Sequence, residues 1–365
     1  MSSEVNTASR EPMFRTVKHD SLTKKQAFLL RIGALLVALM AGGVFILLIG
    51  YSPLEVYRTI ITGSFRSAMA IQAVIKIMVP LVICALSVTL AFKMKFWNIG
   101  AEGQMIMGAV FASYFALYHS YLNHFVLLFV MLAAGMLGGG LWGLIPAFFK
   151  TKFGTNETLL TLMLNYIALN IIVFLREGIW RDPESAGYAK IANFADNAVL
   201  DKVFGVHIGW IIALVLVALV FVYIRFHKHG YEISVVGDSK ATANYAGMSV
   251  KKIVLRTMFI SGGIAGIGGM IEACGSARTL STGVAGGVGF TAIIVAWLAR
   301  LNPIAILIVT FLFAILEKGS SVVETSLGLS SASADVLQGI ILFFVLGCEF
   351  FVQYKFIKRK KGGKN

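Results

Sequence analysis

The chain has 365 residues, of which 58% are hydrophobic and 14% are charged, and its formal net charge is +14. Because soluble domains carry about 25% charged residues, this composition excludes an ordinary soluble domain and predicts an all-α polytopic membrane protein. The excess lysines and arginines lie in short loops and tails beside apolar runs, which is typical of membrane proteins and argues against a nucleic-acid partner.

About ten apolar segments divide the chain. Residues 1–26 are polar and basic without apolar periodicity, so we expect a disordered cytoplasmic tail there. Residues 27–354 form the expected transmembrane domain, which contacts membrane lipid, and residues 355–365 form a second basic cytoplasmic tail. The expected spans are 27–50, 69–92, 99–118, 125–149, 156–175, 208–226, 253–273, 290–299, 304–317 and 335–354, with an interfacial amphipathic helix over 54–66.

The distribution of charge and glycine adds detail to this arrangement. With ten spans, 22 of the 32 lysines and arginines lie on the side of the two termini and eight on the other, which predicts that both termini are cytoplasmic. Spans eight and nine are short for a simple crossing, so we expect broken or re-entrant segments. Span four is rich in small residues that favour close helix contact rather than lipid exposure: Gly135, Gly138, Gly139, Gly140 and Gly143.

A polar stretch, FWNIGAEGQ, opens the third span at residues 96–104. It contains Asn98, Glu102 and Gln104, with Gly100 and Gly103 between them. An ionisable residue within a membrane segment is costly unless it faces protein, water or a pathway. The glycines indicate close backbone packing or a non-helical start to the span.

Further polar residues occur within or at the start of other spans. Gln72 lies one helical turn before Lys76 in span two, and Asn156, Glu157 and Asn165 lie in span five. Together with Asn98, Glu102 and Gln104, these residues line a polar substrate pathway in one interpretation. In the other, they cap helices or form interhelical hydrogen bonds, and Glu102 and Glu157 each gain from a helix N-terminus.

Residues 227–252 form a long polar stretch between two spans. Asp238 or Ser239 caps a predicted short helix within it, and Gly247 ends that helix. A short capped helix at the membrane surface suits docking into a groove of a partner protein, and an ordinary connecting loop is the alternative.

Enzyme motifs are missing from the sequence, so we expect neither catalytic residues nor a cofactor. It contains no G-x-x-x-x-G-K-[ST], H-E-x-x-H or G-x-S-x-G motif. Cys84, Cys274 and Cys348 are widely spaced in apolar segments, which predicts packing thiols rather than a metal site or a disulfide framework.

Three motifs resemble permease subunits of bacterial ABC importers for branched-chain amino acids, simple sugars and nucleosides. They are FWNIGAEGQMIMGA at 96–109, GYEISVVGDSKATANYAGM at 230–248 and GVGFTAIIVAWLARLNPIAILI at 287–308. The segment TNETLLTLMLNYIA at 155–168 is most similar to nucleoside-uptake members. The resemblance covers nearly the whole chain beyond about residue 30, and the longer basic N-terminal tail departs from it.

This resemblance implies a multi-pass subunit in the bacterial plasma membrane with several partners. These are an ATP-binding cassette ATPase, a second permease subunit, which we expect to form a heterodimer with this chain, and an external substrate-binding lipoprotein. Residues 239–247 match the coupling helix that inserts into the ATPase. The residues assigned to this coupling role are Asp238, Ser239, Lys240, Ala243, Asn244, Tyr245 and Gly247.

The expected function is nucleoside import by alternating access. Amides such as Asn98, Gln104 and Asn165 suit a neutral, hydroxyl-rich solute, and the spans contain no dense ring of like charge, which an ion pore requires. The alternatives are a pentose or similar sugar and then branched-chain amino acids. Two alternatives of another class are a proton-coupled secondary transporter that uses Glu102 or Glu157 and a membrane scaffold.

Overall fold

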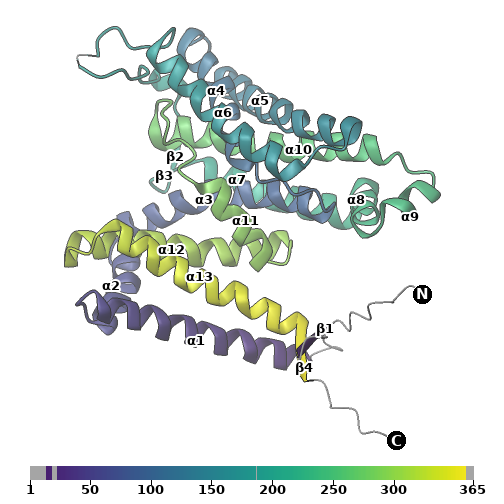
Figure 1. The fold of residues 1–365 in the computed structure, drawn as a ribbon. Helices are drawn as coiled ribbons and strands as arrows, with labels where there is room; N and C mark the ends of the chain where they lie inside the picture. The colour runs from purple at the N-terminus through teal and green to yellow at the C-terminus, as the bar shows by residue number, and fades with distance from the viewer. Residues whose placement is uncertain (1–13, 19–22, 186, 359–365) are drawn as a thin grey trace, which may run out of the picture. The chain divides into compact units, whose positions relative to one another are not determined.

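The computed structural model describes residues 14–18, 23–185 and 187–358 (Figure 1). The chain forms two compact units, one from residues 1–57 with 327–365 and the other from residues 58–326. Each unit is described by itself.

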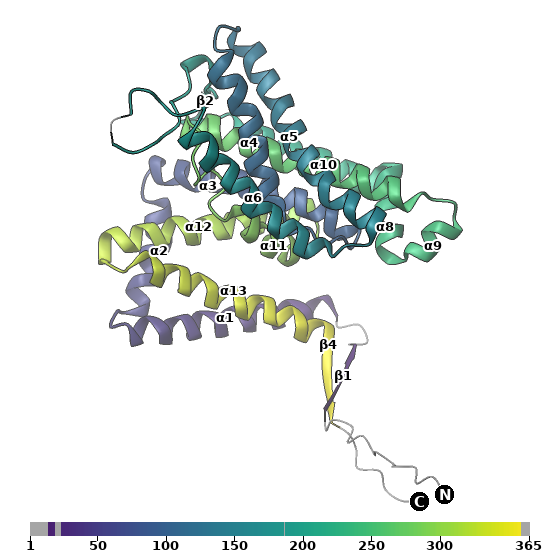
Figure 2. The same cartoon turned by 45° about the horizontal axis from the view of Figure 1, so that its top comes forward.

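The first unit pairs the two ends of the chain. Helix α1 (Lys24–Leu48) packs against α13 (Ser331–Gln353), and strand β1 (Phe14–Lys18) pairs antiparallel with β4 (Tyr354–Lys358), as Figure 2 shows. Thr23 begins α1 with a capping box, because its hydroxyl accepts from the Gln26 N–H while its own N–H donates to the Gln26 side chain. The expectation of a disordered tail over 1–26 is therefore wrong for the strand and for the start of α1, and its other positions lie outside the described residues.

The second unit contains most of the helices. They are α3 (Ala68–Lys93), α4 (Ala101–Tyr118), α5 (His124–Phe153), α6 (Glu157–Glu177), α7 (Gly209–Phe226), α8 (Lys228–Asp238), α9 (Lys240–Tyr245), α10 (Val250–Ile271) and α11 (Val288–Leu298). In the sequence, helix α2 (Pro53–Phe65) lies at the start of this unit and helix α12 (Pro303–Leu327) lies at its end. Between α6 and α7 lie a 3-10 turn (Asp196–Ala198) and the hairpin of β2 (Lys202–Val203) and β3 (Val206–His207), and α10 continues into a π-helical turn (Glu272–Ala277).

The helices establish a multi-pass membrane protein. Among the described residues, six helices are long and apolar enough to cross a membrane, or seven if the bent pair of Ile32–Leu48 and Pro53–Phe65 is one span. The expectation of about ten spans with cytoplasmic termini is not confirmed and stays a prediction. The prediction of a short span eight is confirmed, because α11 has 11 residues. The prediction that span nine is short is wrong, because α12 has 25 residues.

Helix α12 continues past Glu317 and Lys318 because the residues after them, Gly319 and Val322, pack against α2.

Helices α4, α5 and α10 form the core of the second unit by direct backbone contact. A Cβ atom added to Gly266 of α10 would collide with the carbonyl oxygen of Gly135 of α5, and one added to Gly139 would collide with that of Gly262. A Cβ at Gly108 of α4 would likewise collide with the backbone of Gly266. The close helix contact predicted from the glycines of span four is thus confirmed.

Candidate transport site and coupling segment

The candidate site begins where the chain leaves α3 and enters α4. Asn98, in the connecting loop, pairs amide to amide with Gln104 in the first turn of α4, through bonds of 3.1 Å and 3.2 Å. The Oδ1 atom of Asn98 also accepts the N–H of Gly100 at 2.9 Å. Both side chains are buried, and these hydrogen bonds give their polar atoms partners inside the protein.

Helix α6 supplies the remaining partners of this loop. The Asn165 side chain accepts the N–H of Gly103 at 2.8 Å and donates to the carbonyl oxygen of Ile99 at 2.9 Å. The Thr161 hydroxyl accepts the N–H of Ile99 at 3.2 Å. A non-helical segment within a membrane domain needs such partners for its backbone groups, because no water satisfies them in hydrocarbon. These side chains therefore allow α4 to start late, after the predicted non-helical entry.

Glu102 joins α4 to the short helix α11. Its two carboxylate oxygens accept the N–H groups of Gly287 at 2.8 Å and of Gly289 at 2.7 Å, and the residue is 8% exposed. The carboxylate thus caps the N-terminus of α11, where unpaired N–H groups and the helix dipole favour an anion. Gly287 has a φ of +84°, which favours glycine, and a Cβ at Gly289 would collide with the backbone of Glu102.

The other predicted pathway residues lie at separate places. Asn156 caps α6 by accepting the N–H of Leu159 at 3.1 Å, and Glu157 forms a 2.6 Å ion pair with Lys150 at the end of α5. Gln72 of α3 donates to the carbonyl oxygen of Phe204 at 3.1 Å, in the loop between β2 and β3. Asn98, Glu102, Gln104 and Asn165 are brought together, whereas Gln72 is not part of their cluster.

The polar stretch between α7 and α10 folds into two consecutive helices, α8 and α9. Of the two predicted caps, Ser239 begins α9, because its hydroxyl accepts the N–H of Thr242 at 3.2 Å, while Asp238 ends α8. Gly247 follows α9 with a φ of +72°. Ala243 is buried and anchors α9, whereas the Tyr245 side chain is 97% exposed. Lys240 and Asn244 are exposed too, and α9 lies beyond the ends of the neighbouring helices (Figures 1 and 2).

Helix α8, which the sequence did not reveal, holds this segment in place. Glu232 of α8 and Arg256 of α10 form a 2.6 Å ion pair, and the hydrogen bond from Arg256 lowers the pKa of Glu232. A Cβ at Gly237 would collide with the carbonyl oxygen of Lys93, so α8 also lies directly against the end of α3. Helix α9 is therefore connected through α8 to both α3 and α10.

Cationic side chains gather at this end of the second unit, which we call the basic end. Helix α3 ends there against α8, and α10 begins there. Helix α5 ends there as well, since Gly143 packs on the backbone of Met258 and Gly262 in α10. The basic end comprises Lys93, Lys95, Lys150, Lys152, Lys251, Lys252, Arg256 and Arg300.

Residues 69–346 match the family model described as "Branched-chain amino acid transport system / permease component". The chain belongs to this permease family. It is 30% identical over 88% of its length to the glucose ABC transporter permease protein of Haloferax volcanii, covering 87% of that protein. It is 30% identical over 91% of its length to the guanosine ABC transporter permease protein of Bacillus subtilis, covering 96% of that protein. It is 29% identical over 92% of its length to a nucleoside ABC transporter permease protein of Lactococcus lactis subsp. cremoris, covering 95% of that protein.

These matches establish the permease as a transport subunit and a multi-pass plasma membrane protein. They also agree with the resemblance drawn from the motifs at 96–109, 230–248 and 287–308, which all lie within the matched residues.

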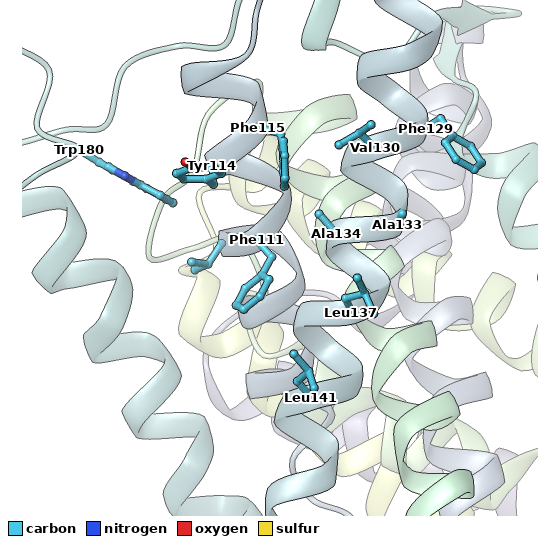
Figure 3. A pocket seen from close by; sticks show the side chains of 11 residues that line it. Phe111, Tyr114, Phe115, Phe129, Val130, Ala133, Ala134, Leu137, Leu141 and Trp180 are labelled. Atoms are coloured by element: carbon cyan, nitrogen blue, oxygen red, sulfur yellow. The ribbon is translucent and has the colours of Figure 1, made fainter. Parts of the chain in front are cut away.

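An apolar hollow of about 650 Å³ lies along α4 and α5 of the permease. Figure 3 shows Phe111 and Phe115 on one helix and Ala134 and Leu137 on the other. The polar tips of Tyr114 and Trp180 are the exceptions in an otherwise apolar lining. Such a surface suits hydrocarbon chains rather than a hydroxyl-rich solute.

A buried histidine lies at the end of α10 away from the basic end. His207 of β3 is fully buried, its ring packs against Gly209 and Gly275, and its Nε2 lies 3.3 Å from the Ser276 hydroxyl. Burial and the nearby charge of Lys76 lower the pKa of His207 to about 4, from an ordinary value of 6.5. His207 is therefore neutral in the folded protein at pH 7.

Acid is expected to destabilise the permease through His207. Between pH 6.5 and 4 the unfolded chain binds a proton at His207, whereas the folded protein does not. The free energy of unfolding therefore has its full value above pH 6.5 and decreases as the pH falls towards 4. The loss approaches about 3 kcal/mol, since one pKa unit corresponds to about 1.4 kcal/mol. Melting temperatures between pH 7.5 and 4.5 should fall less steeply for His207→Gln than for the wild type. Equal slopes for His207→Gln and the wild type would contradict the prediction.

Proposed function

We propose that this permease is the transmembrane subunit of an ATP-driven importer that moves nucleosides across the plasma membrane by alternating access. Its basic end faces the cytoplasm, in agreement with the positive-inside rule. The observation that carries the proposal is the exposed helix α9 at that end, capped by Ser239 and tied through α8 to α3 and α10.

The energy for transport comes from a partner ATPase. The sequence of the permease has no P-loop motif for holding ATP phosphates, and the relatives are named as ABC transporter permeases. The ATPase receives α9, with its exposed Lys240, Asn244 and Tyr245, in a groove of its surface. A second permease subunit completes the pathway, and an external binding lipoprotein delivers the substrate.

The nucleoside assignment is supported by two relatives, which are named for guanosine and for nucleosides and are matched over more than nine-tenths of the present chain. A neutral solute also suits the buried polar cluster of Asn98, Glu102, Gln104 and Asn165, because three of these four side chains are uncharged amides. We propose that Asn98, Gln104 and Asn165 hold the wall of the pathway and that Glu102 positions α11 beside it.

A simple sugar is the second candidate substrate, because one relative is named as a glucose permease and is matched over 88% of this chain. Membership of the ABC permease family argues against a proton-coupled transporter, as do the interactions of both carboxylates that such a transporter needs. Glu102 is used as a helix cap and Glu157 as the partner of Lys150.

Uptake of labelled guanosine should separate these candidates. Cells would carry the complete neighbouring gene set with or without this permease, and unlabelled nucleosides, glucose, ribose and leucine would serve as competitors. We expect uptake to require both the permease and ATP and to be competed by nucleosides alone. Competition by sugars alone would show that the substrate is a sugar rather than a nucleoside. Uptake that does not need ATP but is abolished by an uncoupler would show a proton-coupled transporter instead of an ATP-driven importer.

Loss of the exposed Tyr245 side chain should uncouple transport from ATP hydrolysis. Tyr245→Ala is expected to lower guanosine uptake at least about tenfold, as for a tyrosine at the centre of a protein interface, without lowering the amount of permease in the membrane. Tyr121→Ala is the matched control, since Tyr121 is 78% exposed in the turn between α4 and α5. Equal uptake by the two variants would show that α9 does not couple the ATPase to the permease.

A further inference from the structure

A hollow of about 430 Å³ lies at the basic end, beside the coupling segment. Its lining comes from three parts of the second unit: the end of α3 with the loop that follows it, helix α8, and the end of α11 with the turn before α12. The candidate transport site uses none of its charged residues. The lining charges are Lys93, Lys95, Arg300 and, on α8, Asp238.

Two tryptophans form one wall of this hollow. The rings of Trp97 and Trp297 stack with centroids 5.7 Å apart and an angle of 19° between their planes, and Phe92 packs edge-on against Trp97 at 5.3 Å. The stacking holds both indoles in place, yet Trp97 remains 45% exposed and Trp297 remains 42% exposed. The hollow therefore offers a rigid aromatic surface with one indole N–H on each ring.

Three cations face one carboxylate in the lining, which makes the hollow electropositive. Within the part of the chain that the structure describes, no ion pair is formed by Lys93 or Lys95, although acidic residues pair with other cations at the same end. Lysine and arginine side chains that converge on a hollow at the membrane surface suit a phosphate group, which accepts several charge-assisted hydrogen bonds.

The backbone around the hollow is also unusual. Five non-glycine residues among those described have a positive φ, and three of them line this hollow. Lys95, Arg300 and Leu301 have φ values of +54°, +52° and +55°. L-residues rarely adopt this conformation, and such residues cluster at binding sites and switches. Here it places two cations at the rim of an aromatic hollow.

We propose that this hollow binds a phosphate-bearing ligand, with the phosphate on Lys93, Lys95 and Arg300 and its neighbouring atoms against Trp97 and Trp297. The phosphate belongs either to the headgroup of an anionic phospholipid or to a soluble phosphate ester in the cytoplasm. Because Ser234, Gly237 and Asp238 of α8 form part of the lining, an occupied site ties α8 to α3 and to the turn after α11.

The two sources are distinguished by two binding measurements on the purified full-length permease. In the first, native mass spectrometry counts the phosphatidylglycerol molecules retained after transfer from mixed phosphatidylglycerol and phosphatidylcholine membranes. In the second, the permease in phosphatidylcholine nanodiscs is titrated with inorganic phosphate and with adenosine monophosphate, and the tryptophan fluorescence is followed. Saturable binding in the first measurement assigns the site to lipid, and in the second to a soluble ester.

The double variant Lys93→Gln/Lys95→Gln tests whether the hollow is responsible. We expect it to weaken the observed binding at least about tenfold. Lys251→Gln/Lys252→Gln is the matched control, because it removes the same charge from exposed positions at the same end and should change binding less than about twofold. Trp97→Ala should also weaken binding, and Lys93→Arg/Lys95→Arg should retain it and show that the fold tolerates substitution.

Three outcomes would overturn the proposal. They are an absence of saturable binding for all three probes, an equal loss in the two lysine double variants, and retention of wild-type affinity by both Lys93→Gln/Lys95→Gln and Trp97→Ala. The second outcome would show diffuse attraction of anions to the basic end rather than a site.

Discussion

Glu102→Ala is expected to abolish transport by releasing the N-terminus of α11. The substitution leaves the N–H groups of Gly287 and Gly289 without their acceptors in a buried environment. A buried donor without a partner costs about 1–3 kcal/mol, so the loss of both is large compared with the stability of an 11-residue helix. The effect should be confined to α11 and its neighbours rather than spread over the whole bundle.

Hydrogen exchange and uptake together measure this effect. Amide protection over residues 287–298 should fall at least about tenfold in Glu102→Ala, while α5 and α10 keep theirs, and guanosine uptake should disappear. Glu177→Ala is the control, since that side chain is half-exposed and pairs with the adjacent Arg176. Unchanged protection at α11 together with lost uptake would mean that Glu102 acts on the substrate itself instead of through the helix.

Gly266→Ala is expected to have the larger effect on folding. The new methyl group would meet the carbonyl oxygen of Gly135 and the Cα of Gly139, both of which are backbone atoms that no rotamer change can move. Overpacking a well-packed core typically costs about 1–3 kcal/mol, and we expect a loss at the upper end of that range or above it because two helix backbones must separate. The variant should melt well below the wild type in detergent and reach the membrane in much smaller amounts.

The control for this substitution is Gly33→Ala in α1, where an added Cβ has no heavy atom within 4 Å. It should melt at or slightly above the wild-type temperature, since alanine favours a helix over glycine. A Gly266→Ala protein with the thermal stability of Gly33→Ala would contradict the backbone contact between α5 and α10.

The sequence predicted features that depend on local pattern. Apolar runs predicted the positions of the long helices α3 to α7 and α10, Ser239 and Gly247 gave the bounds of α9, and the glycines of span four predicted close helix contact. The family resemblance, which rests on three motifs, is confirmed by the match over residues 69–346. In each case the signal and the structure lie within one stretch of chain, so no tertiary information was needed.

Features that depend on distant partners could not be predicted. Glu102 and Gly287 are 185 positions apart, and nothing near either residue indicates the bond between them. The same holds for the hydroxyl pair of Ser87 and Ser261, which are 174 positions apart. Helix α8 was missed because its apolar face is short and its polar residues resemble a loop, although Glu232 reaches Arg256 across 24 positions.

The roles assigned to the amides also required the structure. Asn98, Gln104 and Asn165 looked alike as polar residues in apolar spans, and both a pathway and a packing role were consistent with them. Their geometry shows each of them bonded to the loop before α4 or to another amide of the cluster. A buried polar side chain therefore reports its function through its partners, and these partners are invisible in a single sequence.

The backbone contact of α5 and α10 has a mechanical consequence. Most helix pairs meet through side chains, whose rotamers let one helix slide or roll on the other by small steps. Gly135, Gly139, Gly262 and Gly266 have no such side chains, so the two helices lie backbone to backbone at these positions. We therefore expect displacement that enters α10 through Arg256 to carry α5 with it, and we expect the hinges of the transport cycle in irregular segments such as residues 94–100 and 278–287.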